Sequence, residues 1–300
     1  MTETSLAKRI APWSLMALAV VWGSSFFSIK RVLLHLPVTD FLALRFSMST
    51  VVLFIILHRS ITMERKVWIR GGVLGGIWAT GQLLQTAGLA QTTASLCGFI
   101  TGLYVVFTPI LGLVLFKLRV NRWVWAAVAL SLVGLAVLTI RPDASGSGLG
   151  AGELLTVASA VAYAAHICFL GRWSTPKDVA GLTLAQGASM TPIFVLFALP
   201  GGIQLPTTAV DWAWMIYLAT VCGAASIVVQ TWAQGHMDAT KAAVIMCSEP
   251  LWATFFAVLF GGEHLSWMFA LGALAILASM YLVIKPPGSR APPSASVGRL

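Results

Sequence analysis

Residues 93–116 read TASLCGFITGLYVVFTPILGLVLF, an apolar stretch without one charged side chain. An α-helix needs about twenty apolar residues to cross the roughly 30 Å hydrocarbon core of a bilayer, and this stretch is long enough. The whole chain has the same character, because 58% of its residues are hydrophobic and only 10% are charged. Soluble domains carry about 25% charged residues. The composition therefore predicts an integral membrane protein.

Further windows of this kind follow one another along the chain. Together the windows cover residues 10–29, 41–57, 71–91, 93–116, 123–140, 154–171, 179–200, 212–235, 242–262 and 265–284. Within them only Arg45 and Glu249 are ionised near neutral pH. We therefore expect an all-α integral membrane bundle of ten transmembrane helices, joined by short loops.

The Lys and Arg residues indicate how the chain lies in the membrane. With the N-terminus in the cytoplasm, most of them fall on the cytoplasmic side, and only Lys30, Arg31 and Arg141 fall on the outer side. Cytoplasmic loops carry an excess of positive charge, so both termini are expected in the cytoplasm. The net charge of +9 therefore reflects topology. A nucleic-acid surface would need a basic stripe with interleaved aromatic residues. The short loops favour a bacterial inner membrane.

The two halves of the chain resemble each other, which predicts a duplication. Matched pairs lie 141 residues apart: Trp22 with Tyr163, Arg31 with Arg172, Arg45 with Gln186, and Pro109 with Pro250. The same offset pairs Glu249 with Thr108, and a slightly longer one aligns Gln85-Thr86 with Gln230-Thr231. Because each half holds an odd number of spans, the second half would enter the membrane from the opposite side. Two inverted five-helix repeats are typical of secondary transporters.

Several short motifs occur in a characteristic order. They are Trp22-Gly23-Ser24-Ser25-Phe26, Arg45-Phe46, Thr92-Thr93-Ala94-Ser95 before Pro109, Asp238-Ala239-Thr240-Lys241 before Glu249-Pro250, and Gly262-Glu263. On these residues the chain resembles the drug/metabolite transporter superfamily, in its ten-helix branch of paired EamA-like repeats. The resemblance implies a metabolite exporter, and members of the family carry amino acids, phosphorylated sugars or drugs. At the place of Glu263, the first half has Lys117, Leu118 and Arg119, so the halves are not expected to be functionally equivalent.

These observations predict a simple domain organisation. It consists of a cytoplasmic N-terminus (1–9), a first EamA-like repeat of five helices (10–140), a linker (141–150), a second repeat of five helices (151–285) and a disordered cytoplasmic tail (286–300).

Glu249 is the main candidate for transport chemistry. An intramembrane carboxylate is costly and by default marks a functional site. Glu249 lies about halfway along its window and is followed by Pro250, which removes a backbone donor and can loosen the helix. It is expected either to couple transport to protons or to bind a substrate amine. A structural carboxyl group, hydrogen-bonded across helices, is the alternative.

Two further ionisable residues lie within the windows. Arg45 could bind a carboxylate or phosphate in bidentate fashion. The favoured interpretation is structural, in which Arg45 extends to the surface or pairs with an acid.

His166 shares a helical face with Tyr163 and Ser159 and could line the cavity or relay protons. A hydrogen-bonded interior histidine is the alternative.

Aromatic and polar side chains on several windows predict a substrate pocket. Such mixtures suit a small amphipathic molecule, although helix packing explains each residue singly as well. The predicted substrate-binding residues are Trp22, Trp78, Gln82, Gln85, Phe99, Tyr163, His166, Met246, Glu249 and Trp252, with Glu249 and His166 as candidates for proton coupling.

Taken together, the residues favour a secondary transporter that exports small metabolites by alternating access around a central cavity. Amino acids are the favoured class because the pocket is aromatic and weakly charged. The alternatives are a transporter of drugs or other metabolites, including phosphorylated ones, and more remotely an intramembrane enzyme. The chain has no GxxxxGKS/T, GxSxG, HExxH or CxxC motif, so no catalytic residue, cofactor or metal is expected.

The expected partners are a small-molecule substrate and the lipid bilayer, with no nucleic acid. The chain is expected to act as a monomer, because both halves of the pathway lie within it.

Overall fold

The computed structural model describes residues 3–60, 64–117, 122–138, 149–237 and 239–284. Every regular element within these residues is a helix. The predicted tail at 286–300 and most of the predicted linker at 141–150 fall outside the described residues.

The helices follow the predicted windows along the chain. The first part forms α1 (Glu3–Val32), α2 (Val38–Leu57), the short 3-10 helix η1 (His58–Ser60), α3 (Arg65–Gln91), α4 (Ala94–Thr101), α5 (Tyr104–Phe116) and α6 (Arg122–Leu138). The second part forms α7 (Ala151–Trp173), α8 (Val179–Ala198), the 3-10 helix η2 (Leu199–Gly201), α9 (Ala209–Ala219), the π-helix η3 (Thr220–Ala225), α10 (Ser226–Gln234), α11 (Ala239–Met246), α12 (Glu249–Gly261) and α13 (Trp267–Ile284). Because α1 begins at Glu3, most of the segment predicted to precede the first span is helical.

The distribution of side chains is that of a membrane protein. Among the described residues, 6 helical segments are long and apolar enough to cross a bilayer. They are Leu6–Val32, Val38–Ser60, Ala94–Phe116, Ala151–Trp173, Val179–Gly201 and Ala209–Gln234. Large apolar side chains such as Phe54 and Phe260 are exposed, whereas Arg45 and Glu249 are buried. A soluble protein has the reverse arrangement. The chain is therefore a multi-pass membrane protein.

Three of the apolar stretches are not continuous α-helices, in contrast to the windows read from the sequence. The helix opens into a turn at Gly102 and Leu103, between α4 and α5, and again at Cys247 and Ser248, between α11 and α12. The π-helix η3 joins α9 to α10. π-Helical turns are rare and often occur at functional sites. Residues beside the two turns line the cavity described below, and Cys222 of η3 accepts a hydrogen bond from Arg45, which also lines it.

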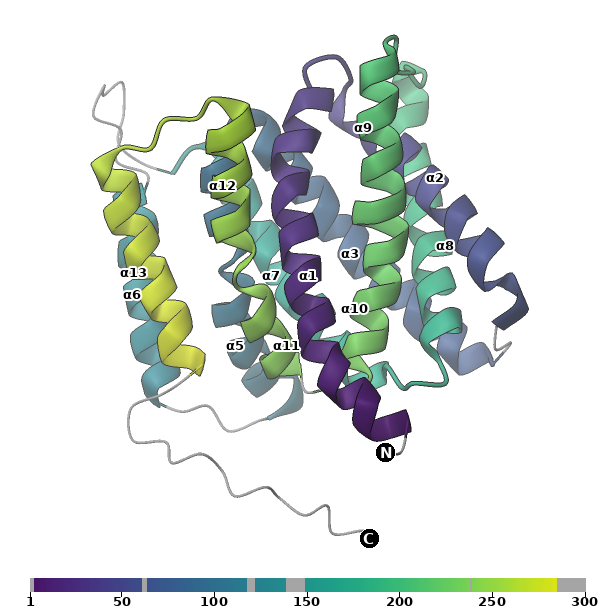
Figure 1. Ribbon diagram of the computed structural model, residues 1–300, viewed down its shortest axis with the longest axis horizontal. Helices are drawn as coiled ribbons and strands as arrows, with labels where there is room; N and C mark the ends of the chain where they lie inside the picture. The colour runs from purple at the N-terminus through teal and green to yellow at the C-terminus, as the bar shows by residue number, and fades with distance from the viewer. Residues whose placement is uncertain (1–2, 61–63, 118–121, 139–148, 238, 285–300) are drawn as a thin grey trace, which may run out of the picture.

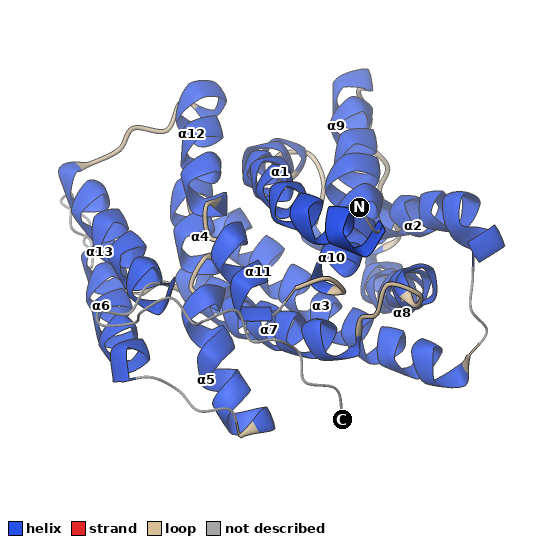
Figure 2. Ribbon diagram, turned by 60° about the horizontal axis from the view of Figure 1, so that its bottom comes forward, coloured by secondary structure: helices blue, strands red, loops and turns tan. Residues whose placement is uncertain are grey.

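Figure 1 shows α6 and α13 side by side at one edge of the bundle and α2 and α8 at the other. Between these edges α3 packs against α7 and α8, and α1 packs against α12. Figure 2 shows the same arrangement tilted, with α1 and α10 near the middle. We call the end of the bundle at which α1 and α12 end, which is at the top in Figure 1, the upper end.

Two glycines allow α3 to approach α8 closely. A Cβ atom on Gly71 would overlap the Ala185 side chain, and one on Gly75 would overlap Ser189. Neighbouring Gly72 and Gly76 face open space instead. Small residues at helix interfaces are expected in membranes, where packing rather than the hydrophobic effect holds helices together.

Candidate functional site

A cavity lies between helices from both halves of the chain. It is lined by Trp22, Ser25, Phe26, Arg45, Trp78, Gln82, Gln85, Thr101, Tyr104, Tyr163, His166, Ile167, Gln230, Met246 and Glu249. Its walls combine aromatic surface with a few polar groups, the composition that small-molecule sites share. Its free volume for water-sized molecules is about 40 Å³. Since one water needs roughly 10–15 Å³ by this measure, the cavity has room for a few waters in this conformation.

The structure brings most of the predicted binding residues together around this cavity. Those that line it are Trp22, Trp78, Gln82, Gln85, Tyr163, His166, Met246 and Glu249. Phe99 and Trp252 do not line it. Phe99 packs edge-to-face on Phe269 of α13 at 5.5 Å, and Trp252 packs on Phe255 at 6.0 Å. Phe99 therefore contributes to the packing of α4 on α13, and Trp252 packs within α12 and lies against Gly23 of α1.

Glu249 is the first residue of α12, and its position has a local cause. The preceding turn at Cys247 and Ser248 ends α11, and Pro250 occupies the first turn of α12, where a proline fits without breaking a helix. The carboxylate thus lies at a helix N-terminus, which favours negative charge. Glu249 is 5% exposed, and the hydroxyl of Tyr104 donates to its Oε2 at 3.3 Å. Pro250 therefore lies at the start of a helix. The helical backbone is interrupted in the turn before Pro250, at Cys247 and Ser248.

Arg45 reaches the cavity from α2 and is 3% exposed. Its Nε donates to the carbonyl oxygen of Leu218 at 3.2 Å, and one terminal nitrogen donates to that of Cys222 at 3.3 Å. The other terminal nitrogen donates to Gln82 Oε1 at 3.4 Å. Arg45 thus neither extends to the surface nor pairs with any described carboxylate. Its contacts to α9 and η3 stabilise the irregular helix, and its lining position leaves it available to a ligand.

Neutral hydrogen bonds connect the remaining polar groups. The Tyr163 hydroxyl donates to Gln85 Oε1 at 2.9 Å, and Gln85 Nε2 donates to Thr101 Oγ1 at 3.1 Å. His166 Nε2 lies 2.8 Å from Gln186 Oε1. The Trp78 ring lies 5.0 Å from the His166 ring and 6.3 Å from that of Trp22. His166 is thus hydrogen-bonded in the interior of the bundle and also lines the cavity.

Sequence reasoning missed several lining residues. Gln230 matches Gln85 in the internal repeat, so the repeat alone could have placed it at the cavity. Tyr104 follows the turn between α4 and α5, and that turn has no clear sequence signal. Ser25 lies in the motif that begins at Trp22, one helical turn away from it.

A second pocket of about 270 Å³ lies at the upper end, beside Lys30, Arg31 and Glu263. Its polar groups already have protein partners. Lys30 Nζ donates to the carbonyl oxygen of Thr92, and Arg31 donates to that of Phe260 at 3.5 Å. The central cavity, which gathers the predicted residues, is therefore the better candidate site.

Glu263 joins the α12–α13 loop to the start of α4. Its carboxylate accepts from the backbone nitrogens of Ala94 at 2.6 Å and Ser95 at 3.2 Å. Thr93 caps the same helix by accepting from Leu96 N at 3.2 Å. These bonds satisfy donors that a helix N-terminus otherwise leaves free. Glu263 therefore has a structural contact in this conformation, at the end of the bundle away from the central cavity.

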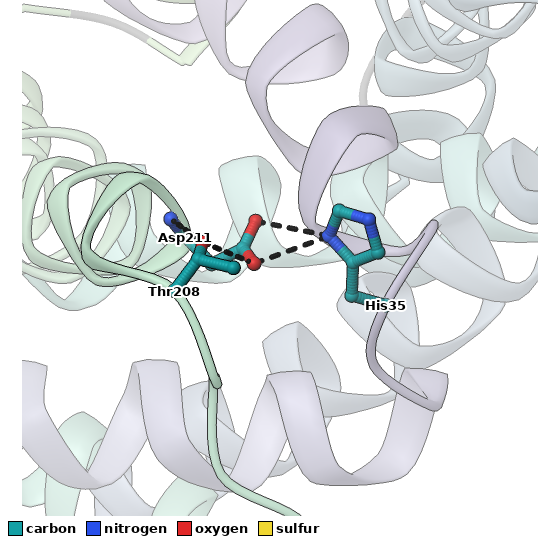
Figure 3. Close-up of polar contacts among 3 residues, drawn as sticks. All are labelled: His35, Thr208 and Asp211. Carbon is teal, nitrogen blue, oxygen red and sulfur yellow. Dashed lines mark hydrogen bonds and ion pairs between the residues drawn. The ribbon is translucent and has the colours of Figure 1, made fainter.

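A second set of contacts holds the upper end together (Figure 3). His35, which follows α1, places Nδ1 3.1 Å from both carboxylate oxygens of Asp211 in α9. The Thr208 hydroxyl donates to Asp211 Oδ2 at 2.8 Å, and Asp211 N donates to Thr208 Oγ1 at 3.1 Å. This reciprocal cap fixes the N-terminus of α9. The contacts join a segment of the first half to one of the second.

The architecture and the mixed polar and aromatic cavity are those of a membrane transporter. The EamA-like transporter family matches residues 10–140 and 150–285. The chain therefore belongs to the EamA-like transporter family, part of the drug/metabolite transporter superfamily, as the sequence motifs indicated.

Individual relatives agree with this assignment. The chain is 28% identical over 283 residues to an "uncharacterized transporter" of Archaeoglobus fulgidus, covering 92% of this chain and 86% of that protein. It is 25% identical over 289 residues to a "probable amino-acid metabolite efflux pump" of Salmonella typhimurium, covering 89% of this chain and 92% of that protein. A crystal structure at 19% identity shares the fold with a TM-score of 0.63 and covers 93% of this chain and 96% of that one.

Proposed function

We propose that this transporter exports small metabolites, amino acids foremost, by alternating access around the central cavity. The single observation that carries the proposal is a partly enclosed cavity lined by aromatic and weakly charged side chains from both halves of the chain. Transporter sites lie at the interface of internal repeats. The relative of Salmonella typhimurium that is named as a probable amino-acid metabolite efflux pump favours amino acids over drugs or phosphorylated metabolites.

The proposed architecture is ten membrane crossings in two inverted repeats, over residues 10–140 and 151–285. Helix bounds support it, because α2 (Val38–Leu57) and α8 (Val179–Ala198) have the same length and begin and end 141 residues apart. The turns before Tyr104 in the first half and Glu249 in the second also correspond, at an offset of 145. On this proposal α4 with α5, α9 with α10, and α11 with α12 each make one crossing.

The proposed location is a bacterial inner membrane with both termini in the cytoplasm, because most basic residues then fall inside. The upper end would face the outside. In the present conformation the cavity is too small for an amino acid, so substrate would enter and leave only after the bundle opens at one end.

The test is counterflow in liposomes that contain the purified protein. Labelled amino acids are offered outside vesicles preloaded with the same unlabelled compound, and empty vesicles are the control. Saturable uptake that other amino acids inhibit supports the proposal. If folded protein moves no amino acid but does move a drug or a phosphorylated metabolite, the substrate assignment is wrong.

A further inference from the structure

Two opposite charges line the central cavity and come from different halves of the chain. Arg45 is part of α2, in the first half, and Glu249 begins α12, in the second. Within the described residues no carboxylate pairs with Arg45, and no Lys or Arg pairs with Glu249. Both side chains are almost fully buried. Among the described residues, Arg45 is held by neutral hydrogen bonds and by the rings of Phe41 and Phe46, at 5.8 and 5.2 Å, and Glu249 by the Tyr104 hydroxyl at the N-terminus of α12.

Such an arrangement is unfavourable unless a ligand completes it. A buried charge without an opposite partner costs free energy, and the cost is greater within a membrane. A guanidinium has five N–H donors, and three hydrogen bonds from Arg45 are present. A carboxylate has about four acceptor sites. Among the described residues, Glu249 receives one hydrogen bond, from Tyr104. Both groups therefore retain capacity for a polar ligand.

The rest of the lining limits the chemistry of that ligand. Trp22, Trp78, Tyr163 and Met246 present aromatic and apolar surface, and Gln82 and Gln85 are neutral. Among the described lining residues, the charges of Arg45 and Glu249 cancel when both are ionised. A ligand with one net charge would leave one of the two unpaired. A zwitterion of small size pairs both.

We infer that the cavity recognises its substrate as a zwitterion, with Arg45 binding the carboxylate, Glu249 binding the ammonium group, and the aromatic wall holding an apolar side chain. The inference rests on the proposed function, because it assigns the two charged groups of an amino acid to two named residues. Bidentate binding of a carboxylate suits the planar guanidinium. Arg45 and Glu249 both determine specificity, because a ligand that lacks either charged group leaves one of these buried residues unpaired.

Wild-type protein provides the first test, which needs no variant to fold. Counterflow of the best-transported amino acid is measured against two competitors, its decarboxylated amine and its deaminated acid. Each competitor keeps the side chain and loses one charged group. We expect each to inhibit roughly tenfold to a hundredfold more weakly than the unlabelled amino acid, because hydrogen bonds to charged groups are strong. Equal inhibition by either analogue would overturn the zwitterion assignment while leaving amino-acid transport in place.

Two variants then assign the charges. Glu249→Gln should reduce the discrimination against the deaminated acid, and Arg45→Gln should reduce the discrimination against the amine. The matched controls are Glu64→Gln and Arg59→Gln, which make the same chemical changes at exposed positions. The controls should keep the wild-type order of inhibition. Unchanged discrimination in folded Glu249→Gln protein would show that Glu249 does not bind the ammonium group. If wild-type protein moves no amino acid at all, the proposed function itself is wrong, and the inference is lost with it.

Discussion

The hydroxyl of Thr50 in α2 lies 2.9 Å from the hydroxyl of Thr191 in α8, and the two residues are 141 positions apart. The same offset relates the ends of the two helices. The surrounding contacts are reciprocal. Thr191 donates to the carbonyl oxygen of Phe46 at 3.1 Å, and a Cβ on Gly187, the equivalent of Phe46, would meet Thr50 Oγ1 at 2.8 Å. Equivalent residues contact each other where a two-fold axis passes between them, so this pair supports the proposed inverted repeats.

Tyr104 and Glu249 form a second pair of this kind. They are hydrogen-bonded, 145 positions apart, and each is the first residue of its helix. The helix bounds thus pair Glu249 with Tyr104, and the sequence alignment that paired it with Thr108 was wrong. The same position carries a phenol in one half and a carboxylate in the other, so the centre of the bundle is asymmetric.

The Thr50–Thr191 contact predicts an energetic coupling. Thr50→Val and Thr191→Val should each destabilise the protein, and the double variant should lose less than their sum by about 1 kcal/mol, the net value of one hydrogen bond. The measurement is a double-mutant cycle of unfolding free energies in detergent. Strict additivity would show that the two hydroxyls do not interact.

Glu249 is the only carboxyl group among the described residues that line the cavity. If it couples export to protons, an imposed pH gradient should drive substrate accumulation in vesicles with wild-type protein and not in those with Glu249→Gln, whose amide does not ionise. Counterflow without a gradient shows whether the variant still binds and moves substrate. Accumulation in both proteins would assign Glu249 to binding or structure alone.

Removal of the Glu263 carboxylate should weaken the start of α4. Glu263→Gln replaces a charged acceptor of two backbone N–H groups by a weaker neutral one, with an expected loss of about 1 kcal/mol. A lower thermal midpoint in detergent would show this loss. Glu64→Gln is the matched control, since Glu64 precedes α3 without a side-chain cap and should leave the midpoint unchanged. Equal midpoints for both variants would refute the capping role.

Alanine substitutions at two neighbouring glycines of α3 should change the stability of the protein in opposite directions. Gly75→Ala would push a methyl group into Ser189 and Gln186 of α8, with an expected cost of about 1–3 kcal/mol. Gly76→Ala meets open space and should stabilise by roughly 0.4–1 kcal/mol through the unfolded state. Thermal unfolding of the two variants side by side tests the prediction. A loss at both sites would contradict the open space found at Gly76, and a gain at both would show that helix propensity outweighs the close packing at Gly75.

Much of the bundle could be predicted because long apolar windows carry a strong signal. Windows such as 41–57 and 154–171 fall within α2 and α7. The turns before Tyr104 and Glu249 could not be predicted, because apolar composition continues through them and tertiary packing decides where each helix opens. For this reason Pro250 was read as an interruption within a helix, whereas it begins one.

The candidate site was predictable in part. Trp78, Gln82 and Gln85 are spaced so that they share one face of a helix, and all three line the cavity. Trp252 was predicted to bind substrate and lies three residues from Glu249, at a spacing that shares a helical face, but it lies against Gly23 of α1. Spacing identifies the residues that share a face. It does not show how far the neighbouring helix covers that face.

The turns at Gly102-Leu103 and at Cys247-Ser248 divide two long apolar stretches into short rods. A continuous helix moves as one lever, so that tilting it at one end displaces the other end as well. A helix that is interrupted by a turn can move on one side of the turn while the other side stays in place. Because Tyr104 and Glu249 directly follow these two turns and are hydrogen-bonded to each other, a molecule that separated them would act on the residues beside both turns. If the two stretches bend at these turns, occupancy of the cavity would change the shape of the wall around it.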